Sequence, residues 1–457
     1  MPRLPPHALA APLALILAAW LPPAAAQGAA APADAPFLPW LNPATPAVLP
    51  AAPPPPPAGQ PERLADLLAR ILPREPQVRV ALAQRQATDE RRLQARSRLG
   101  PSLYLQSSYG QGRETEILQG AISRTTDRTE LGLRWNLYNS GNDRAELAGA
   151  ERDLAAADQE LRRAREDAAE RIAETYVELL HVQAQLGPAA ERLAAVRKLA
   201  EQVRQQTDAG KASAADATQA EASLLDAEIA HEQLLADQTS ARAKLAAQVG
   251  TEVREVAPVV LAPVPAATLQ NGQPGLVEAA RLRADAARER VRPPVSLLAP
   301  RIDLEMRQRL SDRTNPILTT EQKSNWQLVA RWDFPVMGET IARRNEGMRR
   351  AEAAEAEADR IAQTVRADLE SLGARIAIAE RALVVLDRQL QQYDQLVRAG
   401  ELQFDAGRRS LQQLIALRDS RYAIAQRRAD QAHRLLANRM RQLALTGQLL
   451  PALGLGG

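Results

Sequence analysis

The sequence predicts an α+β membrane protein, in which each chain lends four strands to a β-barrel shared between chains and long coiled-coil helices continue from that barrel. Three observations predict this fold class: an internal duplication, strands with one apolar face, and helices too long for a globular core. The duplication has no gap, because Trp332 follows Trp135 by 197 residues. Gly407 follows Gly210 by the same interval. A strand, a helix, a turn and a helix therefore occur twice in one architecture.

Composition agrees with a protein built mostly from helices. Hydrophobic residues make up 45% of the chain and aromatic residues only 3%, so the apolar content is largely Ala, Leu and Val. The 58 basic and 55 acidic residues are interleaved along the helical tracts, which is typical of solvated helix faces with i,i+4 ion pairs. No basic block with interleaved aromatic residues occurs, so we predict no nucleic-acid partner.

Enzymatic and metal sites are not indicated. The chain has no cysteine, which excludes disulfides, thiolate metal sites, cysteine nucleophiles and a lipidated N-terminal cysteine. His181 and His433 each stand alone in a helical tract, and Leu235 stands where a zinc motif beginning at His231 needs its second histidine. Gln205 stands where a phosphate loop ending at Gly210 and Lys211 needs glycine. We therefore predict no catalytic residues, no metal and no cofactor.

The N-terminus predicts export. Residues 1–26 are typical of a signal peptide, with Arg3, an apolar core and a small-residue cleavage site at Ala24–Ala26. Residues 27–61 are rich in Ala and Pro and predict a flexible leader. No later apolar run reaches the length of about 18 residues that a spanning helix needs, so strands must make any membrane crossing.

The first repeat, residues 62–250, opens with a helix that Pro73 and Pro76 interrupt. Period-two alternation then predicts strands at about 102–109 and 129–137, with a polar loop between them. The long hairpin, 142–250, starts with a helix of 67 residues, which spans about 100 Å. Pro188 is expected to kink this helix rather than end it.

A proline-rich connector, 251–275, leads to the second repeat, residues 276–447. This repeat has a shorter helix, strands at about 301–310 and 325–334, and a second long hairpin at 338–447. Residues 448–457 form a C-terminal tail. Helices of this length must pack sideways on one another.

The strands have the pattern of transmembrane strands, because one face is apolar and the other carries charges. We assign the membrane-interface aromatic residues as Trp135, Tyr138, Trp326 and Trp332. The alternative is an amphipathic sheet that covers a soluble core. Four strands cannot close a barrel, since the smallest single-chain barrels have about eight. Open edges are not tolerated in lipid, so several chains must share one barrel.

The chain resembles the TolC-type outer membrane factors, the exit ducts of efflux pumps and type I secretion systems. The resemblance covers about residues 62–450. It rests on the order of four motifs: Leu133–Tyr138 leading to Gly141, Ala209–Ser213 followed by Asp216, Phe404–Leu411, and Leu443–Leu449. It implies a homotrimer with a 12-stranded barrel in the bacterial outer membrane and a long α-helical periplasmic tunnel. A periplasmic adaptor (membrane fusion protein) and an inner-membrane ABC or RND transporter are the implied partners, beside outer-membrane lipid.

The resemblance also implies a periplasmic gate at the hairpin turns. A link between Asp216 and Arg409 would hold the gate closed, with Arg408 beside it. The family's constriction aspartates map onto Gln413 and Ala416, which carry no charge, and Asp419 is the nearby acid. The implied adaptor-docking residues are Gly210, Lys211, Ser213, Gly407 and Ser410. The alternatives are a helix-start charge for Asp216 and solvated turn residues for both arginines.

We therefore expect an outer-membrane exit duct of a tripartite export machine. The missing lipidated cysteine and the Phe404–Leu411 motif favour type I protein secretion. The same duct serving multidrug or small-molecule efflux is the alternative. A more distant alternative is an exported coiled-coil adaptor or scaffold in the periplasm.

Overall fold

The computed structural model describes most of the chain after residue 60, and the described residues are 61–116, 120–262, 264, 274–291, 300–312, 324–332 and 338–455. They belong to one compact unit, Pro50–Gly457. The predicted signal peptide and nearly all of the predicted leader lie outside the described residues. None of the described helices combines the length and the apolarity needed to cross a membrane.

Two short N-terminal helices and a longer one precede the sheet. They are α2 (Leu64–Ile71), the 3₁₀ turn η3 (Leu72–Arg74) and α3 (Pro76–Ser97). Pro73 and Pro76 separate them, because proline lacks the N–H that a continuous helix would need there. The three leucines and the isoleucine of α2 are buried in the core.

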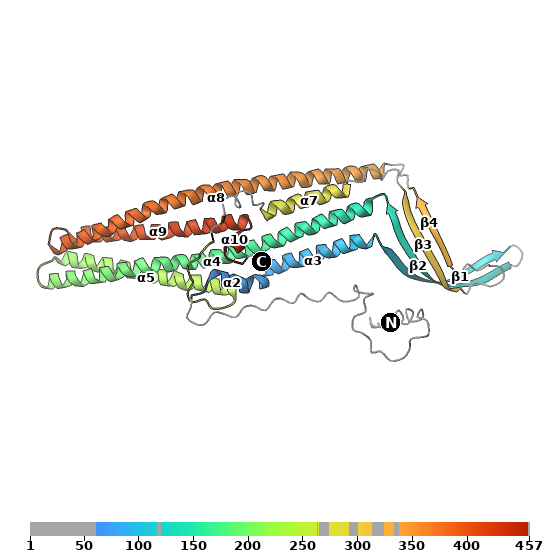
Figure 1. Cartoon of the computed structure of the whole chain (residues 1–457). Coiled ribbons are helices and arrows are strands. Elements are labelled where there is room, and N and C mark those ends of the chain that lie inside the picture. The colour runs from blue at the N-terminus through green and yellow to red at the C-terminus, as the bar shows by residue number, and fades with distance from the viewer. Residues whose placement is uncertain are drawn as a thin grey trace, which may run out of the picture. The chain divides into compact units, whose positions relative to one another are not determined.

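Four strands form one antiparallel sheet in the order β1-β2-β3-β4. Their bounds are β1 Pro101–Glu116, β2 Gly120–Asn139, β3 Arg301–Asp312 and β4 Ser324–Arg331. Each strand pairs with the next along the chain, so the sheet is a meander that the long first hairpin interrupts once (Figure 1). β1 and β4 are its two edges.

The loop predicted at residues 110–128 is wrong, because most of it is strand. β1 and β2 stay paired from Gly110 opposite Thr126 to Glu116 opposite Gly120. Period-two hydrophobicity reports only strands with one apolar face, so a polar strand escapes it. The fourth strand ends at Arg331, before Trp332, and residues 333–337 lie outside the described part of the chain.

The first long hairpin consists of α4 (Asn142–Asp208) and α5 (Ala214–Val249). α4 continues through Pro188, and Gly250 ends α5 in the left-handed conformation with φ 72°. The second repeat contains α7 (Gly275–Val291), α8 (Glu339–Asp405) and α9 (Leu411–Leu445). The predicted tail begins with the short helix α10 (Leu449–Ala452), whose Leu449 is buried.

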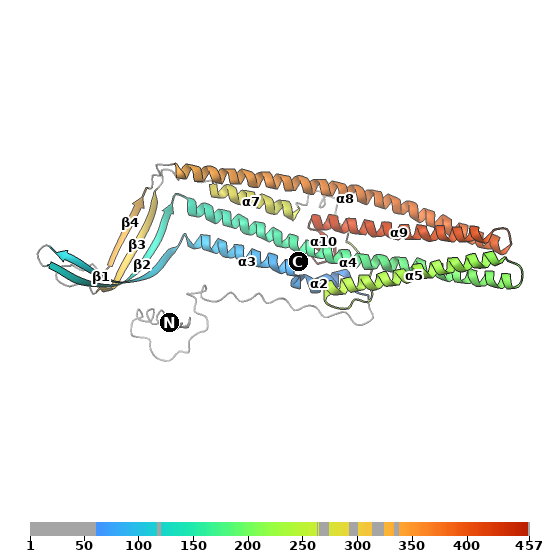
Figure 2. The same ribbon diagram turned by 180° about the vertical axis from the view of Figure 1, so that it is seen from behind.

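The helices pack in one lateral order near the sheet and in another near the turns. Near the sheet, α3 packs on α4, α4 on α7 and α7 on α8. Near the turns, α5 packs on α4, α4 on α9 and α9 on α8. Figures 1 and 2 show α4 and α8 running through both regions, with the strands at one end and both hairpin turns at the other. α9 therefore joins the two hairpins.

The largest apolar core lies between these two regions and surrounds Tyr176 of α4, which is fully buried. The Tyr176 hydroxyl lies 2.7 Å from the carbonyl oxygen of Glu62 and 2.6 Å from that of Ala257. It thereby ties the start of the described chain to the connector between repeats. The C-terminal segment closes this core, because Glu166 accepts hydrogen bonds from the amides of Leu449 and Leu450.

Candidate functional site

The two hairpin turns are built alike. Gly210 and Gly407 both have φ 71°, a conformation that only glycine adopts without strain. The amide of Lys211 donates to the carbonyl of Gln206 at 2.7 Å, and the amide of Arg408 donates to that of Gln403 at 2.8 Å. Such bonds close a helix end. Both Lys211 and Arg408 are exposed, so each turn presents a cation to solvent.

A serine starts the returning helix in each hairpin. The Ser213 hydroxyl oxygen accepts a hydrogen bond from the amide of Asp216, whose carboxylate accepts one from the backbone amide of Ser213 at 3.3 Å. This is a capping box, which stabilises a helix start. Ser410 accepts from the amide of Gln413 in the same way. Within one chain, Asp216 therefore stabilises the start of its own helix, α5.

Arg409 is half-buried and lies over α8. A Cβ atom added at Gly400 would be 2.8 Å from its Nη1 atom, so glycine makes room for this guanidinium group. Asp216 and Arg409 form no ion pair within the described chain. The structure of one chain therefore does not bring these two predicted gate residues together.

The constriction positions of α9 face different surroundings. Gln413 and Ala416 are exposed. Asp419 faces α4, where Arg192 donates to its Oδ1 atom from Nε at 3.1 Å and from Nη2 at 2.8 Å. Asp419 is the only predicted gate residue that we find in an ion pair across the two hairpins in the described chain.

Two further arginines of α9 join the hairpins, and the sequence did not predict them. Arg418 donates to the carbonyl of Ala195 on α4 at 2.9 Å and to Glu401 of α8 at 2.6 Å. Arg421 donates to Asp394 of α8 at 2.5 Å and lies 3.3 Å from Glu191 of α4. We call Arg192, Arg418 and Arg421, with their partners, the arginine layer. Hydrogen bonding to Asp394 raises the pKa of Arg421.

A signal for the arginine layer was present in the internal repeat. At an offset of 197 residues, Asp419 corresponds to Ala222 and Arg421 to Leu224. The second copy therefore has charged groups where the first has apolar ones. Nearer the turns, a small apolar cluster joins α4, α5 and α9: Leu199, Val203, Ala220, Leu411 and Leu414.

The sheet carries its apolar residues on one face across all four strands. Leu103 lies opposite Leu133, Leu133 opposite Met306, and Met306 opposite Trp326. Leu103 is 68% exposed and Trp326 is 70% exposed, so no other part of the described chain covers this face. A face this apolar and this exposed is unusual for a soluble sheet.

The opposite face of the sheet carries polar side chains that bind one another across the strands. Arg134 lies 3.3 Å from Glu305, and Gln327 donates to the same carboxylate at 3.0 Å. The sheet therefore separates an apolar surface from a charged one, as the alternation predicts.

The predicted interface aromatic residues lie at or beside the strands. A bulge between Asn136 and Tyr138 places Tyr138 opposite Ile302, on the apolar side. The Trp135 indole N–H donates to the carbonyl of Leu99 at 2.9 Å, which anchors β2 to the end of α3. Trp332, directly after β4, is 51% exposed.

Comparison with known proteins shows which proteins share this architecture. A family model described as "Outer membrane efflux protein" matches residues 67–251. No curated protein matches the sequence. The chain is similar in structure to the CmeC outer membrane channel of Campylobacter jejuni, with TM-score 0.69, 12% identity, and 84% of this chain and 85% of that chain covered.

Two more solved structures share the fold. The outer membrane protein VceC of Vibrio cholerae matches with TM-score 0.70 and 18% identity, over 86% of this chain and 96% of that chain. The open state of the MtrE outer membrane channel of Neisseria gonorrhoeae matches with TM-score 0.70 and 17% identity, over 85% of this chain and 89% of that chain.

Proposed function

By its outer membrane efflux protein domain and its fold the chain belongs to the TolC-like outer-membrane channels, and we propose that it is the exit duct of a tripartite export machine. In this role it passes substrate from an inner-membrane transporter and a periplasmic adaptor to the outside. The observation that carries the proposal is the exposed apolar face of the four-stranded sheet.

The open sheet requires neighbouring chains. β1 and β4 have unpaired edges within the described chain, and lipid cannot hydrogen-bond to their backbone groups. The helices also have two free sides within one chain, because α3 and α5 lie at one end of the packing order and α8 lies at the other. A ring of identical chains pairs these two sides throughout. Three chains would supply the 12 strands that the family resemblance implies.

The hairpin turns are the proposed docking site of the adaptor. Lys211 and Arg408 are exposed there, and the backbone around Gly210 and Gly407 is held by the same hydrogen bonds in both copies. Two equivalent turns in each chain suit an adaptor with repeated binding sites. An ABC or an RND transporter would then deliver the substrate.

The gate is proposed to depend on two sets of charges. Inside a chain, the arginine layer holds α9 against α4 and α8. Between chains, Arg409 of one copy would meet Asp216 of the next, and this contact would supply the gate link that one chain does not form. Separation of α9 from α4 would widen the end of the tunnel at the turns.

For the cargo we propose a protein delivered by type I secretion, because the Phe404–Leu411 motif resembles that of channels paired with such exporters. Small-molecule efflux is the second candidate, favoured by the description of the matched family model. A periplasmic adaptor or scaffold is disfavoured, since such a protein has no use for the exposed apolar sheet face.

Two measurements test the channel itself. Full-length protein should fractionate with the outer membrane, and the purified protein in planar bilayers should give discrete conductance steps. Monomeric protein that needs no detergent and gives no conductance would contradict the proposal. For the cargo, deletion of the gene should abolish release of a large secreted protein and leave drug susceptibility unchanged, whereas the reverse outcome would support efflux.

A further inference from the structure

A polar groove lies between α3, α4 and α7, at the end of the helices that leads into the sheet. It has a cavity volume of about 430 Å³. Its α4 side alternates acids with alanines at helical spacing: Glu146, Ala150, Asp153, Ala157 and Glu160. Because Ala150 and Ala157 are small and buried, they leave the space open between the carboxylates.

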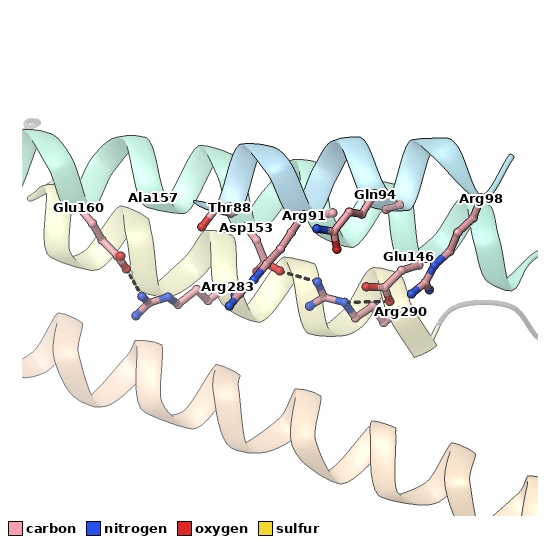
Figure 3. A pocket seen from close by; sticks show the side chains of 12 residues that line it. Thr88, Arg91, Gln94, Arg98, Glu146, Asp153, Ala157, Glu160, Arg283 and Arg290 are labelled. Atoms are coloured by element: carbon pink, nitrogen blue, oxygen red, sulfur yellow. Dashed lines mark hydrogen bonds and ion pairs between the residues drawn. The ribbon is translucent and has the colours of Figure 1, made fainter. Parts of the chain in front are cut away.

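The carboxylates of this groove already have partners on α7. Arg283 pairs with Glu160. Arg290 pairs with Asp153 and lies 3.3 Å from Glu146 (Figure 3). The stem of Arg290 packs on Gly149, where an added Cβ would be 2.9 Å from its Cγ atom. The α7 arginines are thus fixed by the acids of α4.

Two further arginines enter the groove from α3 without a partner. Figure 3 shows the side chains of Arg91 of α3 and of Arg98, directly after α3, extending toward the seam of α4 and α7. Both arginines are exposed within the described chain. Neither forms a hydrogen bond or an ion pair within the part of the chain that the structure describes. The groove holds these two, Arg283 and Arg290 against the three carboxylates, so one positive charge remains. Thr88 and Gln94 add polar groups beside them.

The groove lies close to the proposed membrane boundary. Arg98 directly follows α3 and precedes β1, which begins at Pro101. Arg91 is two helical turns earlier, so at 1.5 Å per residue it lies about 15 Å from the start of β1 along the helix. Trp135, whose indole binds the Leu99 carbonyl, marks the same level. A lipid headgroup of the inner leaflet is within reach of this level.

We propose that the groove binds the phosphodiester group of a membrane phospholipid. A singly charged phosphodiester matches the single unbalanced positive charge, and arginine forms two parallel hydrogen bonds to phosphate oxygens. Arg91 and Arg98 hold the phosphate between them, and the side-chain amide of Gln94 donates to a remaining oxygen. This inference rests on the proposed function, because only a chain in the outer membrane brings lipid to this groove.

The test is retention of phosphatidylglycerol by the full-length protein in detergent, measured by native mass spectrometry. We expect the Arg91→Gln, Arg98→Gln double variant to lose affinity by about tenfold or more, since hydrogen bonds to charged groups are among the strong ones. The matched control is Arg79→Gln, Arg96→Gln, which removes two arginines of α3 that are exposed like Arg91 and Arg98 but do not line the groove. The control should retain the lipid as the wild type does.

Three outcomes would overturn the proposal. The first is that the control variant loses as much lipid as the Arg91→Gln, Arg98→Gln variant, and the second is that the wild type retains diacylglycerol, which has no phosphate, equally well. The third is that inorganic phosphate displaces the lipid, which would assign the groove to soluble anions. Bilayer conductance of the same preparations separates this proposal from the channel. Channels that conduct but retain no lipid remove only the lipid site, whereas protein without conductance removes the proposed function.

Discussion

Arg192 of α4 donates two hydrogen bonds to a single oxygen of Asp419 on α9, from Nε at 3.1 Å and from Nη2 at 2.8 Å. The two residues are 227 positions apart in the sequence. The guanidinium carbon also lies 5.0 Å from the ring centre of Tyr422, one turn further along α9. This contact joins the two hairpins near their turns, where we propose that the channel opens.

Loss of this ion pair should loosen the gate. We expect Asp419→Asn to raise the single-channel conductance or the open time, because Arg192 then loses its charged partner on α9. Since Asp419 is 44% exposed, the pair should contribute only about 1 kcal/mol in a double-mutant cycle with Arg192→Gln. Asp226→Asn, an exposed acid of α5, is the control. Unchanged conductance in Asp419→Asn would remove this pair from the gate.

Arg409 should matter more than its neighbour in the same turn. Arg409→Ser is expected to raise single-channel conductance, because it removes the proposed link to Asp216 of the adjacent chain. Arg408 is exposed in the turn, so Arg408→Ser should leave conductance near that of the wild type. Planar-bilayer recordings compare the two, and equal effects of both variants would argue against a specific Arg409 link.

The apolar sheet face should not tolerate a charge. Trp326→Arg places a cation on the face proposed to meet lipid, at a cost of about 2–4 kcal/mol near the bilayer centre and less toward its surface. We expect less protein in the outer-membrane fraction. Gln327→Arg, one residue along β4 and on the polar face, is the control and should fractionate normally. Normal fractionation of Trp326→Arg would show that this face does not meet lipid.

Glu166 should make stability depend on pH. Burial raises its pKa from 4.5 to about 7, although the amides of Leu450 and Leu449 lower it in part. The folded chain therefore holds this proton more tightly than the unfolded chain does. Stability should fall as the pH rises from 4.5 to about 7, by at most about 3 kcal/mol.

The Glu166→Gln variant tests this dependence, because the amide has no charge to desolvate. Its melting temperature at pH 8 should exceed that of the wild type by a few degrees. The decrease of the melting temperature between pH 5 and pH 7 should be smaller than in the wild type. Glu151→Gln, on an exposed position of the same helix, should change neither. A wild-type slope that persists in Glu166→Gln would contradict the assignment.

His433 should make stability depend on pH in the direction opposite to Glu166. Burial lowers its pKa below 6.5, and the charge of His181, whose ring lies 4.6 Å away, lowers it further. Hydrogen bonding to Val177 and the charges of Glu178 and Asp430 oppose this in part. The neutral ring is therefore favoured in the folded chain, and stability should fall as the pH drops below 6.5.

Local hydrogen exchange detects the effect of His433 separately from that of Glu166. Amides of residues 429–436 in α9 should lose protection between pH 7 and pH 5 in the wild type, after correction for intrinsic exchange rates. In the His433→Gln variant the same amides should lose less protection. His231→Gln, on α5, serves as the control. The same loss in wild type and His433→Gln would exclude this histidine as the cause.

Much of the fold could be predicted because its signals are local. Helix starts and ends follow from glycine and proline, as at Gly250 and Gly338, which both adopt positive φ at a helix boundary. The apolar strand face follows from alternation, and the structure places those residues on one exposed face. The polar extension of β1 and β2 escaped prediction, since alternation is absent there.

The candidate site was predicted only in part. The turns at Gly210 and Gly407 were found from the repeat, whereas the partner of Asp419 was not. Charge alone cannot select Arg192 among the many arginines of a chain with 58 basic residues. The bulge that turns Tyr138 to the apolar side was also hidden, because it depends on the register with β3.

By itself the sequence determined two units of strand, helix, turn and helix with one face suited to lipid, since periodicity and chain breakers act over a few residues. Only the tertiary structure decided that α9 packs between α4 and α8, and so that Arg192 meets Asp419. It also left Arg91 and Arg98 facing a groove whose acids are already paired. The lateral order and rotation of long helices decide which charges meet, and neither is recorded in a local pattern of residues.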